Sequence, residues 1–150
     1  MWHLLLKLVH VLAAIVAVSA NVTYGIWIMR GARDRAALGF ALQGVKLLDD
    51  RVANPAYGLL LATGIGMVLV GKLPVTTPWL LAALVLYVSA VLPGLLGYTP
   101  TLKKQIVLLE STRPDSSEYR AAAGRGVVLG IILGVLTLGI VVLMVLKPGL

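Results

Sequence analysis

The fold is decided first by the stretch from Leu4 to Met29, which reads LLLKLVHVLAAIVAVSANVTYGIWIM. A helix needs roughly 20 predominantly apolar residues to cross the hydrocarbon core of a bilayer, and this run is long enough. Inside lipid the backbone must satisfy its own hydrogen bonds, which a helix does within one segment. The sequence therefore predicts a first transmembrane helix over residues 4–29.

Three further apolar runs follow, at residues 55–70, 78–97 and 126–146. Hydrophobic residues make up 59% of the 150-residue chain and charged residues 13%. Soluble domains are about half apolar and about a quarter charged, so this composition departs toward lipid. The prediction is an all-α fold: an integral membrane four-helix bundle, with residues 1–150 forming a single transmembrane domain.

The two long connections, residues 30–54 and 98–125, each carry five Lys or Arg residues, whereas the rest of the chain has three. Basic residues near the ends of spans are retained on the cytoplasmic side. We therefore predict cytoplasmic long connections and non-cytoplasmic termini, in a multi-pass protein of the plasma membrane. The formal charge of +7 then reflects topology, and no nucleic-acid partner is expected.

Both long connections contain helical patterns. In residues 36–53 the apolar side chains recur at steps of three and four, at Leu38, Leu42, Val45, Leu48 and Val52. This spacing predicts an amphipathic helix that either lies on the membrane surface or extends the second span. A similar extension of the third span is predicted by Leu102, Ile106 and Leu109. Pro114 and its polar neighbours predict a turn within residues 111–117.

Small residues recur every four positions in two spans, at Gly58, Ala62 and Gly66, and at Gly126, Gly130 and Gly134. Such spacing favours close helix packing, although the same glycines would also leave space for a flat cofactor. Pro93 lies inside the third span and is expected to kink it. Trp2 and Trp79 are expected to anchor the outer interface, as aromatic-belt residues do.

A polar stripe runs along the first span. Its members recur at spacings of 4, 3, 4, 3 and 4, at His3, Lys7, His10, Ala14, Ala17 and Asn21. At 100° per residue they share one helix face, and an inward face gives polar groups partners that lipid lacks. We therefore predict that the stripe points into the bundle.

His10 is the sharpest candidate on this stripe. Ionisable residues inside a membrane are functional hypotheses by default, and a neutral imidazole is a good ligand for haem or a metal. The competing interpretation is a neutral histidine hydrogen-bonded to a neighbouring helix. His3 lies on the same face and cannot oppose His10 across one iron, whereas Met67 lies at a similar depth and is the candidate second ligand.

Lys7 and Asn21 complete the candidate site. Lys7 either snorkels to the outer interface or binds an anionic group beside His10, and snorkelling is commoner near a span end. Asn21 is favoured as an interhelical hydrogen-bonding group over a ligand.

Several classes of site are excluded by the residues themselves. The chain has no cysteine, so it has no disulfide, iron–sulfur cluster or thiolate metal site. No catalytic residue is assigned, because no paired carboxylates, phosphate-binding loop or Ser/His/Asp set is found. All six acidic residues fall in the two long connections, and their absence from the spans argues against a carboxylate-based transport pathway.

Short motifs in all four spans carry a resemblance. They are Leu6–Ala14 (LKLVHVLAA), Pro55-Ala56, Thr63-Gly64, Pro78-Trp79-Leu80 and Met144–Pro148 (MVLKP). The chain resembles a group of small bacterial membrane proteins of unknown function. That group is distantly similar to the haem-binding membrane protoporphyrinogen oxidases and to the membrane domain of copper-resistance protein D.

The resemblance implies that His10 matches the first-helix histidine of those oxidases, which is implicated in haem binding. The oxidases also carry a lysine shortly after the Pro-Trp of the third helix. This chain has Leu81-Ala82-Ala83-Leu84 there, which puts oxidase activity in doubt.

The leading hypothesis is a membrane protein that binds haem (haem b), a porphyrin or a metal through His10, and whether it is an enzyme stays open. The first alternative is a structural or accessory subunit without cofactor. The second alternative is a small transporter. The expected partners are the lipid bilayer and either a second copy or another membrane protein.

Overall fold

A computed structural model describes residues 1–111 and 116–148 of the chain, and every element in those residues is helical. Two rods are single helices, α1 (Trp2–Arg33) and α6 (Ser117–Leu146). The other two rods each combine two α-helices through a π-helical segment. The second rod consists of α2 (Arg35–Leu48), η1 (Asp49–Ala53) and α3 (Asn54–Gly71). The third rod consists of α4 (Pro78–Pro93), η2 (Gly94–Tyr98) and α5 (Thr99–Ser111).

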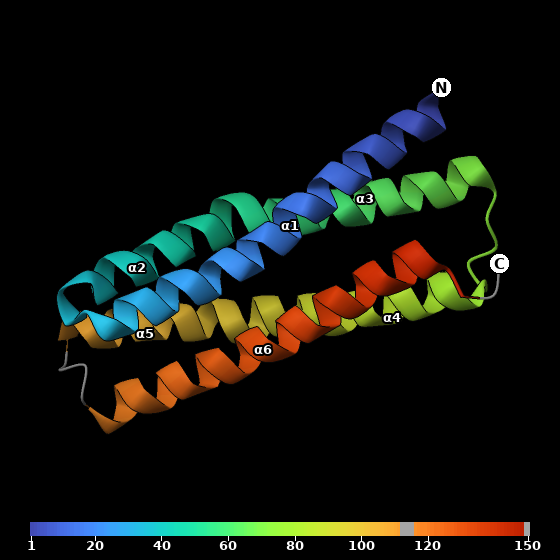
Figure 1. Ribbon diagram of the computed structural model, residues 1–150. Helices are drawn as coiled ribbons and strands as arrows, with labels where there is room; N and C mark the ends of the chain where they lie inside the picture. Colours follow the sequence, from blue (N-terminus) through green and yellow to red (C-terminus); the bar gives the residue numbers. More distant parts are fainter. Residues whose placement is uncertain (112–115, 149–150) are drawn as a thin grey trace.

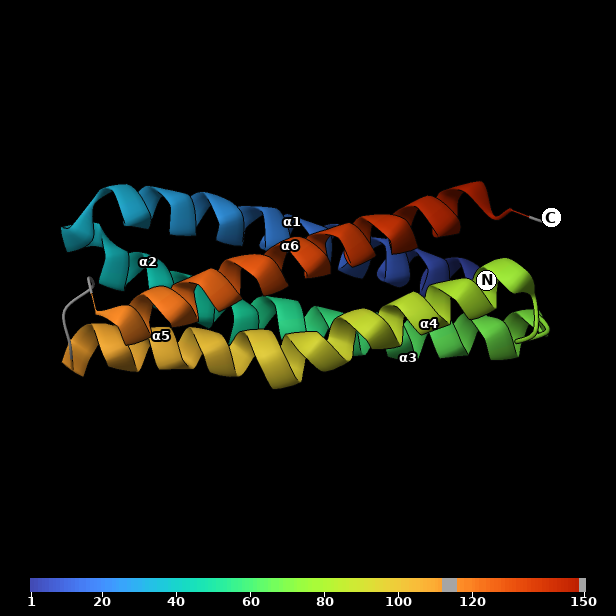
Figure 2. The same ribbon diagram turned by 90° about the horizontal axis from the view of Figure 1, so that it is seen from below.

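The four rods run up and down as an antiparallel bundle. Figure 1 places both termini and the connection between α3 and α4 at one end, which we call the termini end. The turn from α1 to α2 and the start of α6 lie at the opposite end, which we call the basic end. Figure 2 shows α6 crossing the bundle obliquely, from beside α5 at the basic end to the opposite side at its C-terminal end.

Local sequence explains where the helices begin. The Asp34 carboxylate accepts a hydrogen bond from the Ala36 N–H at 3.0 Å and so caps α2. Ser116 caps α6 in the same way, accepting from the Tyr119 N–H at 3.2 Å. Pro78 is the first residue of α4, where a missing N–H costs nothing, whereas Pro55 follows η1 directly within a continuous rod. The predicted turn at residues 111–117 falls mostly on residues 112–115, which lie outside the described part of the chain.

All four rods are long and apolar enough to cross a membrane, which confirms the predicted number of spans. They contain between 30 and 36 residues. At about 1.5 Å per residue each rod is at least about 45 Å long, and the hydrocarbon core is only about 30 Å thick. The amphipathic pattern of residues 36–53 therefore extends the second span, and residues 99–111 extend the third.

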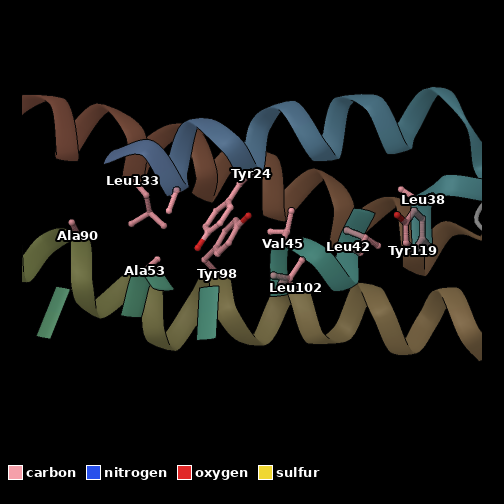
Figure 3. Close-up of a cluster of buried hydrophobic side chains, with 11 residues drawn as sticks. Tyr24, Leu38, Leu42, Val45, Ala53, Ala90, Tyr98, Leu102, Tyr119 and Leu133 are labelled. Carbon is pink, nitrogen blue, oxygen red and sulfur yellow. The ribbon is translucent and has the colours of Figure 1, made fainter. Parts of the chain in front are cut away.

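The best-buried apolar side chains lie toward the basic end. Leu42 and Val45 on α2 and Leu102 on α5 are the largest fully buried side chains, with 0%, 0% and 1% of their surface exposed. Figure 3 shows them between the rods, in line with the stacked rings of Tyr24 and Tyr98. Of the five apolar side chains that predicted the amphipathic helix over residues 36–53, Val52 is exposed, at 36%.

Toward the termini end the rods form two pairs. There α1 packs along α3, and α4 packs along α6, whereas α2 also packs against α5 near the basic end. Gly66 brings α3 close to Leu6, and Gly130 brings α6 close to Tyr98, as the glycine spacing predicted. Gly58 and Gly134 differ, because a Cβ built on either would meet no atom within 4 Å.

Each π segment accommodates one extra residue in a rod. The Asn54 N–H donates to the Asp49 carbonyl, and the Thr99 N–H donates to the Gly94 carbonyl, both five residues back. Pro93, which was expected to kink the third span, directly precedes η2, so the interrupted hydrogen-bond ladder continues as a π turn.

Trp79 corrects one expectation. The two tryptophans were predicted to anchor the outer interface, and Trp2 is indeed 72% exposed. Trp79 is only 8% exposed and lies inside the bundle, with the Lys147 ammonium 5.5 Å from the ring centroid. Its ring therefore packs between α4 and the carboxyl-terminal end of α6.

Candidate functional site

The inward face of α1 is lined with small residues. Ala13, Ala17, Ala20 and Tyr24 are each 6% exposed or less, and they recur at steps of four, three and four. The predicted stripe follows this face only in part, because His10, Ala14 and Asn21 are half-buried beside it. His3 and Lys7 are exposed at the termini end, so the expectation that the whole stripe points inward is wrong for these two residues. The bundle splays there, and the exposed Lys7 agrees with the snorkelling interpretation.

His10 is held by the second rod. Its Nδ1 lies 2.8 Å from Thr63 Oγ1, and the Thr63 hydroxyl itself donates to the Leu59 carbonyl at 2.7 Å. Because the Thr63 hydroxyl has the Leu59 carbonyl as an acceptor, its oxygen can accept from His10 Nδ1–H, and this is the tautomer that we assign. This tautomer leaves the lone pair on Nε2. Gly64 permits the approach, since a Cβ there would lie 3.5 Å from His10 Cε1.

Met67, the candidate second ligand, lies one helical turn beyond Thr63 on the same helix, α3. The structure therefore pairs His10 with Thr63, on the helix that also carries Met67. Within the described residues, no group of three or more His, Cys, Asp or Glu side chains could hold a metal ion.

Asn21 joins a polar network in the middle of the bundle. Its Nδ2 donates to Tyr57 Oη at 2.7 Å, which is the interhelical hydrogen bond favoured from the sequence. The Tyr87 hydroxyl donates to the Tyr57 carbonyl at 2.7 Å. These two bonds connect α1, α3 and α4.

A cavity of about 240 Å³ lies next to this network. All four rods line it. The polar lining residues are Asn21, Asp49, Asn54, Tyr57, Tyr87 and Thr137. Its walls are otherwise apolar, with Leu61 from α3 and Leu133 from α6. Gly58, which leaves open space, also lines it.

Asp49 is the residue that the sequence interpretation missed. It is 5% exposed, and its Oδ2 accepts a hydrogen bond from the Thr99 hydroxyl at 2.7 Å, which joins η1 to the first residue of α5. Asp49 lies outside the predicted second span, residues 55–70, but in the helical rod that continues it, so a buried carboxylate stands directly beside the spans. The signal was present, because Asp49 follows Leu42 and Val45 at steps of three and four.

Comparisons with known proteins agree with this architecture. A family model described as "Predicted integral membrane protein (DUF2269)" matches residues 4–148. Neither a curated protein nor a solved structure matches the chain. The family match spans all four rods and includes His10, Thr63 and Asp49.

Proposed function

Since the chain belongs to the DUF2269 family of predicted integral membrane proteins, we propose that it binds haem or a related porphyrin in the membrane through His10. The observation that carries this proposal is the hydrogen bond between His10 Nδ1 and Thr63 Oγ1 at 2.8 Å. Histidines that ligate metals generally donate their other ring N–H to a fixed acceptor, which sets the tautomer and orients the ring. Thr63 is such an acceptor.

The donor set fits haem with one protein ligand. A porphyrin already supplies four nitrogens, so a single imidazole on its axis is sufficient, whereas a bare metal ion needs several protein ligands. His10 has no companion for a bare ion among the described residues. Met67 shares a helix with Thr63, which argues against a sixth ligand from Met67 on the opposite face of a porphyrin.

We propose binding without catalysis. Haem supplies a one-electron couple when bound, and the chain's own contribution is to hold and orient the imidazole. The stretch Leu81–Leu84 offers no ionisable group where the resembling oxidases carry lysine. The likeness to those oxidases and to copper-resistance protein D supports the proposal only as a resemblance.

The test is a visible spectrum of the protein purified in detergent, with and without added haemin. We expect a Soret band that disappears in His10→Ala and persists in His3→Ala, because His3 is an exposed histidine on the same helix. Thr63→Val should weaken haemin binding by about 10–100-fold, as loss of an orienting acceptor does. Met67→Leu should leave the spectrum unchanged.

A second candidate function is an accessory subunit without cofactor, assembled with a second copy or with another membrane protein. The same His10–Thr63 bond favours it, because a hydrogen bond between α1 and α3 also serves helix packing. A colourless protein that ignores haemin, in which His10→Ala lowers only thermal stability, would establish this role and refute the first.

We propose further that the basic end faces the cytoplasm of a bacterial cell, which places both termini and residues 72–77 outside the plasma membrane. The support is the concentration of Lys and Arg in the two long connections, ten of the thirteen in the chain.

A further inference from the structure

Asp49 and the cavity beside it form a second candidate site. Asn21, the residue of α1 that lines this cavity, lies about 16 Å along α1 from His10. We infer that this cavity binds a primary ammonium group of an amphiphile, with Asp49 as the counter-ion. The inference goes beyond the haem proposal and does not depend on His10. It is carried by the charge of Asp49, by an unpartnered hydroxyl beside it and by the shape of the cavity.

Asp49 lacks a cation. Of its neighbours, Lys46 forms its ion pair with Asp50 instead, one residue further along the chain. Among the described side chains, no Lys or Arg forms an ion pair with Asp49. A buried carboxylate is costly unless it is paired and hydrogen-bonded. The Thr99 hydroxyl and the Asn54 side chain donate hydrogen bonds to Asp49. Lys46 attracts it, but no cation contacts it among the described side chains. An external cation in the adjoining cavity would supply the missing charge.

Tyr24 gives an independent indication of a ligand. Its side chain is 5% exposed, yet its hydroxyl has no hydrogen-bond partner among the described residues. Figure 3 shows the Tyr24 ring reaching from α1 toward Ala53 of η1, with the hydroxyl at the far end. The Asp49 carboxylate is close enough to act electrostatically on this hydroxyl. A buried polar group without a partner needs an explanation. Tyr24 does not itself line the cavity, but its hydroxyl oxygen could accept a hydrogen bond from an ammonium group held next to Asp49.

The π segments explain why this site exists. Each inserts one residue, and Thr99 Oγ1, at the start of α5, bonds Asp49 Oδ2 of η1. Local π turns are frequent at functional sites, because they displace backbone and side chains from the regular helix. Here they leave a space among the rods and hold a carboxylate at its edge.

The cavity favours a group that arrives from the bilayer. Its lining includes exposed residues of α3 and η2, namely Gly58, Leu61 and Leu95. These residues form an open edge on the outer surface of the bundle. The volume of about 240 Å³ is below the roughly 300–1,000 Å³ typical of sites that enclose a whole ligand, so it suits an ammonium head with part of a chain.

The depth agrees with an interfacial ligand. Asp49 lies 22 positions from Gly71, which is about 33 Å at the usual helical rise. The hydrocarbon core is about 30 Å thick, so a membrane that begins at the termini end places Asp49 near its opposite boundary. Amine headgroups lie at that level. The same chemistry is offered by an aminophospholipid headgroup and by a free alkylamine.

The first experiment measures thermal unfolding of the purified protein in detergent with n-butylammonium chloride. A ligand that binds only the folded state raises Tm, and we expect a rise of several degrees. The rise should be absent in Asp49→Asn and retained in Glu110→Gln, which removes an exposed carboxylate of α5 and leaves the Lys46–Asp50 ion pair intact. Neutral n-butanol at the same concentration should give no rise. An equal response to n-butanol, or no response of the wild type to either probe, would overturn a charge-dependent site.

A cavity-filling variant keeps the test decisive if Asp49→Asn does not fold. Gly58→Leu places a side chain in the open space of the cavity with Asp49 intact, and it should abolish the n-butylammonium response. Gly25→Leu is the matched control, because Gly25 is exposed and its Cβ would also meet no atom. Loss of the response in both variants, or in neither, would contradict binding in this cavity.

The source of the ammonium group is resolved in lipid nanodiscs. If an aminophospholipid is the ligand, Tm is higher in phosphatidylethanolamine than in phosphatidylcholine, and the difference vanishes in Asp49→Asn. If a free alkylamine is the ligand, n-butylammonium raises Tm in phosphatidylcholine discs instead. Should neither arm depend on Asp49, the ammonium site is refuted.

Discussion

At the scale of single residues, packing at the basic end rests on a few fully buried side chains. Leu42 and Val45 on α2 meet Leu102 on α5 in the same cluster of buried residues. Near them Gly126 approaches Gln105 so closely that a Cβ would lie 2.6 Å from its Nε2. These contacts tie the basic ends of three rods together, where the rods extend past a bilayer.

Leu42→Ala should lower the free energy of unfolding by about 2–5 kcal/mol, because it removes buried methyl groups and leaves a cavity that the rods cannot close. Leu47→Ala on the same helix should change it by less than about 0.5 kcal/mol, since Leu47 is 60% exposed. The measurement is thermal or denaturant unfolding in detergent. Equal losses in the two variants would show that the basic end is not packed as described.

At the scale of elements, the two π segments decide which side chains face inward beyond them. If η2 kept all its residues but were wound as regular α-helix, Thr99 and the rest of α5 would be rotated by about 100° relative to α4. The same holds for α3 relative to α2 across η1. The π turn therefore brings the buried face of the helix before it and the buried face of the helix after it to the same side of the rod. A continuous 3.6-residue repeat would not do so.

Deleting Leu96, an exposed residue of η2, should restore a regular helix and preserve the faces on either side. Deleting Val85 in the regular part of α4 should instead rotate Trp79 and Ala83 out of the bundle. We expect the Leu96 deletion to unfold within a few degrees of the wild type and the Val85 deletion to lose most folded protein. Size-exclusion profiles and Tm in detergent measure this. Comparable damage in both would contradict a single inserted residue in η2.

At the scale of the whole molecule, the bundle has two chemically different ends. The termini end carries the short connection between α3 and α4, and the basic end carries the charged extensions of all four rods. Because rods of 30 to 36 residues exceed the hydrocarbon thickness, one end must project into water. The proposed topology assigns that projection to the cytoplasm.

The natural chain has no cysteine, so single-cysteine variants report topology without background. Ser117→Cys, exposed at the basic end, should resist an impermeant thiol reagent in intact cells and react after permeabilisation. Thr76→Cys, exposed at the termini end, should react in both conditions. The reverse pattern would invert the proposed orientation without changing the fold.

The sequence by itself determined the four spans, the helical extensions and the Asn21 contact between helices. These features depend on local composition and on the 3.6-residue repeat, which lipid enforces because an unsatisfied backbone is too costly there. The partner of His10 was not determined in this way. Thr63 is 53 positions away, and only the packing of α1 on α3 brings the two side chains together.

Asp49 shows most clearly what could not be predicted from the sequence. Asp49 follows Leu42 and Val45 at steps of three and four, so its burial was legible in the spacing. A carboxylate next to Asp50 and Arg51 is ordinarily solvated, however, and the sequence analysis assigned it no role in the predicted amphipathic helix over residues 36–53. Only the tertiary structure decided that it faces Thr99, Tyr24 and a cavity. The physical reason is that η1 and η2, in separate rods, line the same cavity and that Asp49 bonds Thr99, 50 positions away. Which distant segments come together depends on packing, and no local pattern encodes it.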